Sequence, residues 1–501
     1  MHLGNLSVGL GAAFPTILPH HLHLPQLHHL PHPHLERNAS EPVHHMDPVV
    51  VATTVHLAGA AAGALLIAMV GSTLGRKAAL LAATLPDMLG WLLVAGTALA
   101  PPAMAAPLLL AGRALTGVAA AAHLSLAQVY VAETVQTEHR GWMAGLAVPI
   151  ASIGVMAMYV LGSWLAWHHV AAACLLPPAL LAVLLCFMVD TPHSLLLRGR
   201  EKEAHAAMEQ LRGGDASAVQ ELHLIQGSVE AEVQGGLCAK LALLATQRKY
   251  YSPLFILNFL IVLTLLTGVA TMNLYANQLF QLAGGHMSFY LSNIIIGLIQ
   301  LAGSCLFLPL VKAYSRKQLL SSSALVMCAS LATLGLYLYS QTRYEQFFLA
   351  VSRSDWLAIL SFSSFLLAAP TGLVSIPLLY TAELFPTELR CLLSGLTIAF
   401  TSIAILVARL LFPYLEAALQ PHGLLWVSAA SCIATILFTL SCIPETRHKD
   451  LATIPDKFEA WRKEARVSPW VTPAGTPSHS RATTPHREIK KLDMKTQMFT
   501  K

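Results

Sequence analysis

Long apolar runs, separated by short polar turns, fill most of this chain of 501 residues. A helix needs about 20 predominantly apolar residues to cross the hydrocarbon core of a bilayer. The runs are continuous and do not alternate with polar residues, so they predict helices and exclude a transmembrane β-barrel. The predicted spans cover residues 48–71, 78–99, 105–132, 142–166 and 169–189, and then 253–281, 287–313, 318–340, 355–382, 391–415 and 421–443.

A shorter apolar run, residues 3–19, precedes these spans and begins almost at Met1. It barely reaches the length of a span, and we interpret it as the first one, with truncation of this helix as a hypothesis that explains its length. The pattern then predicts an all-α polytopic membrane protein of six spans, a polar segment and six further spans. An even number of spans places both termini on the same side of the membrane.

A polar stretch over residues 190–250 separates the two sets of spans and predicts short amphipathic helices outside the bilayer. The tail from residue 444 is charged and rich in Ser, Thr and Pro, which is typical of a disordered segment. The predicted domains are an N-terminal six-helix bundle (1–189), a cytoplasmic helical linker (190–250), a C-terminal six-helix bundle (251–443) and a cytoplasmic tail (444–501).

The segment 20–47, between the first two predicted spans, is rich in proline and histidine. It contains the glycosylation sequon Asn38-Ala39-Ser40, which indicates an external loop. Histidine is a good ligand for zinc or copper. A solvated loop explains the same composition, so we predict no metal site and no cofactor, and metal binding by this loop stays open as the alternative.

Composition supports a membrane protein. Hydrophobic residues make up 55% of the chain and charged residues 11%, whereas ordinary soluble domains carry about 25% charged residues. The mean hydropathy is +0.59. Basic residues gather at the ends of the spans and in the central linker, which indicates cytoplasmic surfaces. The net charge of +5 is no signature of nucleic-acid binding.

One segment occurs twice. The first copy, VYVAETVQTEHRG, carries Glu133 and Arg140, and the second, LYTAELFPTELRC, carries Glu383 and Arg390 at the same spacing. Two residues at this spacing lie close to one face of a helix, so acid and base can pair or reach charges on neighbouring helices. The two copies indicate duplication of a half-molecule, an organisation common in transporters.

The motifs around these copies resemble those of the sugar porter family of the major facilitator superfamily. Within the family, Phe412-Pro413 and His422-Gly423 are similar to the arthropod branch of facilitated trehalose and glucose carriers. The resemblance implies the major facilitator fold and sugar transport. It is carried by the stretches Leu74-Gly75-Arg76-Lys77, Gly112-Arg113, Asp190-Thr191-Pro192, Glu383-Leu384-Phe385-Pro386 and Pro444-Glu445-Thr446-Arg447.

Several positions depart from the family pattern. Ser72 and Lys312 stand where the family has aspartates, and Thr264-Leu265 replaces a glutamine pair. In the family, such glutamines bind sugar hydroxyls. These departures keep two alternatives open: a carrier of another small polar solute, such as a polyol or a carboxylate, and a non-transporting sugar sensor on the same fold.

A sugar site requires neutral donors and acceptors deep in the bundle. Thr264, Thr267 and Gln278 fall at helical spacing on one face of the predicted seventh span. Hydrogen bonds that join helices to one another are the alternative role for such residues. The candidate substrate-binding residues are Gln128, Tyr130, Thr264, Thr267, Asn273, Tyr275, Asn277, Gln278, Asn293 and Gln300.

Charges at the predicted cytoplasmic ends of the spans form the second candidate site. We expect them to form a network that closes the inner gate, since a buried charge that loses its partner is costly. Their alternative role is to set membrane topology alone. The candidates are Arg76, Lys77, Glu133, Arg140, Arg316, Glu383, Arg390 and Glu445.

Three ionisable residues lie well inside predicted spans: Asp87, His123 and Arg409. Charge at that depth usually faces a cavity or a partner. The first predicted span contains no acid, whereas proton-coupled members of the resembled family carry one there. This difference favours facilitated diffusion over proton symport.

No catalytic triad, phosphate-binding loop or metal signature occurs in the sequence, which argues against an enzyme. The resemblance and the repeated halves predict facilitative transport of a sugar of the trehalose or hexose class by alternating access. The expected location is the plasma membrane. The expected partners are the lipid bilayer and a small-molecule solute, without nucleic acid. The oligomeric state stays open, and a monomer is compatible with this function.

Overall fold

The computed structural model of the protein describes residues 2–18, 48–213, 216–230, 237–272, 288–343 and 355–446, and the regular structure in these ranges is entirely helical. Ten of the described helices are long and apolar enough to cross a bilayer. The predicted all-α membrane fold is therefore confirmed. The histidine-rich loop with Asn38, and the tail from residue 447, lie outside the described residues, so the statements about them stay predictions.

The first half opens with a short helix, α1 (Leu3–Ala13), continued by a 3₁₀ turn, η1 (Phe14–Thr16). Prolines in the first turns of α5 and α9 help to explain where those helices begin, because the first turn has no use for the missing amide. Five further spans follow: α3 (Pro48–Leu74), α4 (Arg76–Gly96), α5 (Pro102–Thr134), the pair α6 (Thr137–Gly145) and α7 (Ala147–Trp164), and the pair α8 (Trp167–Ala173) and α9 (Leu176–Phe187).

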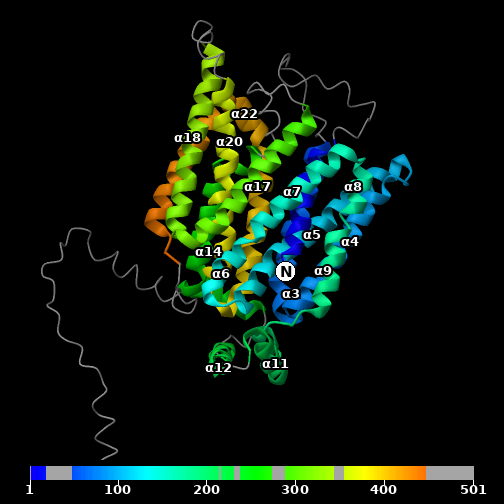
Figure 1. Cartoon of the computed structure of the whole chain (residues 1–501), viewed down its shortest axis with the longest axis vertical. Coiled ribbons are helices and arrows are strands. Elements are labelled where there is room, and N and C mark those ends of the chain that lie inside the picture. Colours follow the sequence, from blue (N-terminus) through cyan, green and yellow to red (C-terminus); the bar gives the residue numbers. More distant parts are fainter. Residues whose placement is uncertain are drawn as a thin grey trace, which may run out of the picture. The chain divides into compact units, whose positions relative to one another are not determined.

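Four short helices come next in the chain. In α11, charged residues face outward, whereas Ala204, Ala207 and Met208 are buried against Leu195 and Leu222. α11 and α12 lie beyond one end of the spanning helices (Figure 1). The four are α10 (Pro192–Leu197), α11 (Glu201–Arg212), α12 (Ala216–Glu230) and α13 (Leu237–Thr246).

The predicted helix over residues 253–281 is wrong at its centre. The first helix of the second half ends at Leu266, and Gly268 has a φ of 82°, a conformation that favours glycine. The helices of this half are α14 (Arg248–Leu266), α15 (Val269–Met272), α17 (Phe289–Ala313), α18 (Arg316–Arg343), α20 (Asp355–Thr371), α21 (Ser375–Glu383), the 3₁₀ turn η3 (Thr387–Leu389) and α22 (Arg390–Cys442).

α22 contains the last two predicted spans in one element. They join at Gln420, whose φ of 58° is not helical. Pro421 follows directly, and its missing amide cannot continue the hydrogen-bond ladder of the helix before it. With α22 counted as two spans and α1 as one, the described helices form two sets of six.

Small residues bring the helices of the first half close together. A Cβ built at Gly63 or Gly117 would meet backbone oxygens of the facing helix at 2.4 or 2.1 Å, so α3 and α5 touch backbone to backbone. Such close packing drives helix association in lipid, where burial of apolar surface gives little gain. Large apolar side chains are exposed instead, including Leu85, Phe187, Phe255, Leu336 and Leu437.

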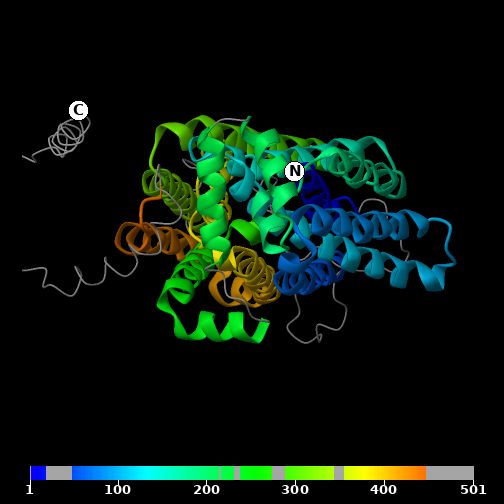
Figure 2. The same ribbon diagram turned by 90° about the horizontal axis from the view of Figure 1, so that it is seen from below.

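The two halves meet along several helix pairs: α3 with α22, α5 with α21, α6 with α17 and α21, and α7 with α17. Seen from below, most of the blue-to-cyan helices of the first half lie on one side and the green-to-orange helices of the second half on the other (Figure 2). The candidate rim charges lie at the ends of helices that take part in these contacts.

Candidate functional site

Arg76 and Glu133 form a buried ion pair where α4 begins and α5 ends. Arg76 donates to Oε1 of Glu133 through Nη2, at 2.8 Å, and through Nε, at 3.1 Å. The two side chains are 2% and 3% exposed. Because both charges are withdrawn from water, each depends on the other for compensation.

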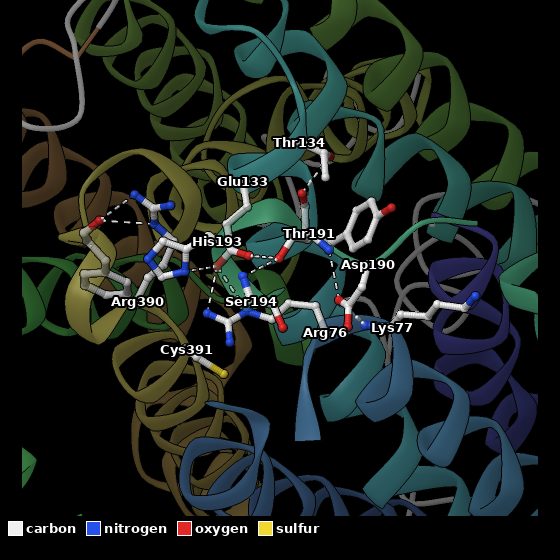
Figure 3. A network of polar contacts seen from close by, with 12 residues as sticks. Arg76, Lys77, Glu133, Thr134, Asp190, Thr191, His193, Ser194, Arg390 and Cys391 are labelled. Atoms are coloured by element: carbon white, nitrogen blue, oxygen red, sulfur yellow. Dashed lines mark hydrogen bonds and ion pairs between the residues drawn. The ribbon is translucent and has the colours of Figure 1, made fainter. Parts of the chain in front are cut away.

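The segment after α9 completes this first cluster (Figure 3). Thr191 donates its hydroxyl to Oε2 of Glu133 at 2.5 Å, and Nδ1 of His193 lies 3.7 Å from Oε1 of the same carboxylate. Asp190 accepts from the backbone amide of Lys77 at 3.3 Å. We call Arg76, Glu133, Asp190, Thr191 and His193 the first rim cluster.

Gly75 makes the tight turn that brings α3 and α4 to this cluster. Its φ of 83° lies in the left-handed region, which favours glycine. A Cβ built there would lie 1.1 Å from Nη2 of Arg198, the guanidinium that binds Asp190 at 2.8 Å. The glycine therefore makes room for the Arg198–Asp190 pair.

A second cluster repeats this arrangement in the other half. Arg316, at the start of α18, donates through Nη2 to Oε1 of Glu383 at 2.8 Å, and Thr446 donates to Oε2 of Glu383 at 2.6 Å. Glu445 accepts from the backbone amides of Arg316 and Lys317 at 3.2 and 3.4 Å. We call Arg316, Glu383, Glu445 and Thr446 the second rim cluster.

The two clusters share one plan, which fits the duplication inferred from the sequence. In each, an arginine that begins one helix binds a glutamate that ends another, and a threonine donates to the same glutamate. The acid before that threonine caps the helix of the arginine, Asp190 in the first half and Glu445 in the second. We call the end of the bundle that carries both clusters the charged rim.

The expectation that each repeated acid and base lie on one face of a helix is wrong. Glu133 ends α5 and Arg140 lies in α6, and likewise Glu383 ends α21 and Arg390 opens α22. The glutamates bind Arg76 and Arg316 on neighbouring helices, which is the other arrangement that the spacing had left open. Arg390 donates through Nε and Nη2 to the carbonyl of Phe385, both at 3.2 Å, and so closes the turn between two helices.

Sequence reasoning found the arginines and glutamates but missed four members of these clusters: Asp190, Thr191, His193 and Thr446. An acid followed by threonine occurs after the last span of each half, as Asp190-Thr191 and Glu445-Thr446. That repeated dipeptide was the available signal. Lys77, a predicted member, points its Nζ toward the carbonyl of Cys186 at 3.2 Å and contributes its backbone amide to the cluster.

The Arg76–Glu133 and Arg316–Glu383 ion pairs each lie within one half, but the second pair also contacts the opposite half. Gly141 of α6 belongs to the first half, yet a Cβ built there would lie 2.3 Å from Nη2 of Arg316 and 3.3 Å from Oε1 of Glu383. The backbone of α6 therefore rests directly against the second rim cluster. Both clusters accordingly lie at the same end of the bundle.

The structure separates the two substrate candidates of α5. Gln128 is buried and donates to the carbonyl of Ala144 at 3.2 Å, while its Oε1 has no hydrogen-bond partner among the described residues. Tyr130 donates to the carbonyl of Val189 at 2.7 Å, beside the first rim cluster. Gln128 keeps an acceptor available for a ligand, whereas Tyr130 ties α5 to the segment after α9.

The candidates of the second half lie on α14 and α17. Oγ1 of Thr264 is buried without a partner in the described part of the chain, and Thr267 donates to the carbonyl of Thr264 at 2.6 Å. Asn293 is buried and Gln300 half-buried on α17. The remaining candidates lie outside the described residues: Asn273, Tyr275, Asn277 and Gln278.

Tyr380 of α21 is a polar residue that the sequence did not single out. It is 1% exposed, and its hydroxyl has no hydrogen-bond partner among the described residues. It occupies the same place in the second repeat as Tyr130 does in the first, so the two copies have diverged in what this tyrosine binds.

The three ionisable residues predicted inside spans, Asp87, His123 and Arg409, lie in different surroundings. Asp87 accepts from the hydroxyl of Ser7 at 2.6 Å, and Nδ1 of His123 lies 3.6 Å from the same carboxylate oxygen. These three residues come from α4, α1 and α5, so they join helices within the first half. Arg409 is half-buried on α22.

Arg113, part of the Gly112-Arg113 motif, is a fully buried cation. Its Nη2 donates to the carbonyl of Gly11 at 2.8 Å, and its guanidinium lies 5.5 Å from the centre of the Phe14 ring. The side chain is therefore held by a main-chain carbonyl and a π face of the first helical segment.

Comparison with known proteins extends over both halves. Residues 34–458 match the family described as "Sugar (and other) transporter". The chain is 31% identical over 387 residues to the facilitated trehalose transporter Tret1 of Culex quinquefasciatus, covering 77% of this chain and 72% of that protein. It is 31% identical over 331 residues to the facilitated trehalose transporter Tret1-2 homolog of Drosophila simulans, covering 66% and 67%.

A solved structure shows the same fold. The proton:xylose symporter XylE of the major facilitator superfamily, bound to 6-bromo-6-deoxy-D-glucose, superposes with a TM-score of 0.75. The similarity covers 91% of this chain and 97% of that one, at 20% sequence identity.

Proposed function

Because this chain belongs to the sugar transporter family of the major facilitator superfamily, we propose that it carries a sugar of the trehalose or hexose class by facilitated diffusion. In the proposed cycle the two halves rock against each other, and a central site opens to one side of the membrane at a time. The proposed location is the plasma membrane, with the charged rim, α10–α13 and both termini on the cytoplasmic side.

The observation that carries this proposal is the pair of matching rim clusters, one in each half. Each cluster ties the ends of its own helices together, which supports residues 1–189 and 251–443 as separate domains. Removing one partner of a buried ion pair costs about 3–5 kcal/mol, so each half resists deformation at this end. The contact of Gly141 with Arg316, in contrast, joins the halves without an ion pair and separates more readily.

The rim clusters therefore have a positioning role in this proposal. They keep each half rigid, and the contacts between the halves open and close. This assigns the Arg76–Glu133 and Arg316–Glu383 pairs to their own halves, whereas the single network that closes the gate stays a prediction for the remaining rim charges.

The proposed sugar site lies between the halves, on α5 of the first and on α14 and α17 of the second. Gln128, Thr264 and Asn293 supply neutral amide and hydroxyl groups, which suit a ligand that offers a ring of hydroxyls. The unpaired Oε1 of Gln128 and Oγ1 of Thr264 are the best candidates for direct contact. Thr267 and Gln300, and the four candidates outside the described residues, complete the proposed set.

Passive flux is supported by the surroundings of Arg113. This buried arginine donates to a backbone carbonyl of α1, and α1 itself contains no Asp or Glu. A proton-coupled site built on this arginine would pair it with a carboxylate that takes up and releases the proton.

The test is solute flux in proteoliposomes that contain the purified chain. We expect saturable uptake of radiolabelled trehalose or glucose that is unchanged by a protonophore. Gln128→Ala and Thr264→Val should each raise the sugar concentration for half-maximal uptake about tenfold, since a hydrogen bond to a buried polar group contributes about 1–1.5 kcal/mol. Flux of polyols or carboxylates alone, or sugar binding without flux, would contradict the proposal.

A further inference from the structure

We propose that Trp142 of α6 and Lys312 of α17 form a latch between the two halves at the charged rim, and that the equivalent place in the other repeat lacks such a latch. The proposal rests on the alternating access proposed above. It assigns a positioning role to two residues that belong to neither the sugar site nor the rim clusters.

The latch is a cation–π contact. Nζ of Lys312 lies 4.5 Å from the centre of the Trp142 ring, well inside the limit of about 6 Å for this interaction. Tryptophan is the most favourable aromatic partner for a cation. α6 belongs to the first half and α17 to the second, so the contact joins the halves.

The neighbours of Trp142 on α6 hold it in place for this contact. Gly141 rests against the Arg316–Glu383 pair, and a Cβ built at Gly145 would lie 2.7 Å from the ring of Phe307. Two glycines on one face therefore let α6 approach α17 and the start of α18 closely. Trp142, between them in sequence, reaches the cation near the end of α17.

The corresponding contact of the other repeat is made by a thiol and has no cation or aromatic ring at the matching positions. In the sequence repeat, Cys391 occupies the place of Gly141 and Leu392 that of Trp142. Cys391 is buried against α3, where its Sγ would lie 2.7 Å from a Cβ built at Gly71 and is 3.9 Å from the carbonyl of Ile67. Leu392 has no π face, and Ser72, the counterpart of Lys312, has no cation.

The halves are thus joined at the rim by two unlike contacts. We call the contact of α6 with α17 and α18 the first seam, and that of α22 with α3 the second seam. Since Lys312 is exposed, its cation–π contact should shift the balance between closed and open rims about two- to fivefold. The first seam therefore responds to the charge of the Lys312 side chain, whereas the Cys391 contact in the second seam combines packing with a weak hydrogen bond from a thiol to a carbonyl.

Cys391 provides a reporter for opening of the rim. It is 5% exposed in the second seam, away from the latch. In a variant whose seven other cysteines are replaced, a hydrophilic maleimide reacts with Cys391 only when the seams separate. Protein in lipid nanodiscs presents both membrane faces to the reagent, so the result does not depend on orientation.

We expect Lys312→Met and Trp142→Ala each to raise the labelling rate of Cys391 about two- to fivefold. The double variant should label no faster than the faster single variant, because both remove the same contact. Lys312→Arg should keep the original rate. Lys317→Met is the matched control, since Lys317 is a nearby cation that reaches the carbonyl of Leu440 in its own half.

An unchanged labelling rate in both Lys312→Met and Trp142→Ala would overturn the latch. So would an equal increase in Lys317→Met, because the effect would then be one of general charge. Labelling needs no sugar, so it separates the two proposals. Chains that show the labelling response without sugar flux would contradict the proposed transport and leave the latch standing.

Discussion

The two rim clusters share a plan but differ in burial and in their neighbours. The Arg76–Glu133 pair is 2% and 3% exposed, whereas the Arg316–Glu383 pair is 7% and 8% exposed. The first glutamate also has His193 beside it, and the second cluster carries α6 of the opposite half on its surface. The second cluster therefore forms part of the contact between halves, in addition to the role in holding its own half together that we propose for both clusters.

The largest effect is expected at the more deeply buried pair. Glu133→Gln leaves the Arg76 charge buried without its partner and should reduce the free energy of unfolding by about 3–5 kcal/mol. Thermal unfolding of the purified protein measures this loss. Arg76→Met combined with Glu133→Gln should recover most of it, because no unpaired charge remains. A loss below about 1 kcal/mol would show that the pair is unimportant.

The same change in the second cluster should cost less. Glu383→Gln removes the carboxylate that Arg316 binds, but this pair is slightly more exposed to water, so we expect the free energy of unfolding to fall by about 3 kcal/mol. Glu209→Gln, on the exposed face of α11, is the control and should leave the unfolding temperature unchanged. A larger loss in the free energy of unfolding for Glu383→Gln than for Glu133→Gln would contradict the expectation that the first cluster contributes more to stability.

The turns beside the two clusters offer a sharper contrast. Gly75→Ser should cost at least about 2 kcal/mol, because its φ of 83° is unfavourable for serine and a side chain there displaces Arg198 from Asp190. Ser315 occupies the corresponding turn and caps α18 by accepting from the amide of Gln318. Ser315→Gly should therefore cost only a few tenths of a kcal/mol. Chemical unfolding of both variants measures the two losses in the free energy of unfolding. Equal losses would contradict the different roles assigned to Gly75 and Ser315.

A smaller effect than at Gly75 is expected where α6 rests on the second cluster. Gly141→Ala places a methyl group against the guanidinium of Arg316, whose flexible side chain can shift, so we expect a loss of about 1 kcal/mol. Labelling of Cys391 should increase at the same time, because the seams fit less closely. Gly227→Ala is the control, since a Cβ at Gly227 meets nothing within 4 Å. Alanine inside α12 should stabilise that helix slightly, so a loss at Gly227 as large as that at Gly141 would contradict the proposed contact.

The fold could be read from the sequence because lipid imposes a simple rule. Spans must be long, apolar and helical, so the apolar runs gave the number and order of the helices. The break at Gly268 and the kink at Gln420 were harder to predict. They arise where a glycine or a following proline interrupts an otherwise continuous apolar pattern.

The rim charges could be found in the sequence, but their pairing could not. Glu133 and Arg140 suggested a local pair, yet the helix ends at Thr134 and the glutamate binds Arg76. Which of several nearby charges meet depends on the packing of helices distant in sequence. The cation–π contact of Trp142 with Lys312 could not be predicted for the same reason, although Lys312 departs from the family pattern.

The central claim is that two rigid halves, each held by its own rim cluster, move against each other when sugar is carried. Distances between spin labels test it most directly, in nanodiscs with and without trehalose or glucose. One pair at the exposed positions Glu138 and Tyr314 spans the first seam, and another at Tyr314 and Ser441 lies within the second half. Sugar should change the distance distribution of the first pair and leave that of the second unchanged. A change confined to the pair within one half, or none in the pair across the seam, would contradict it.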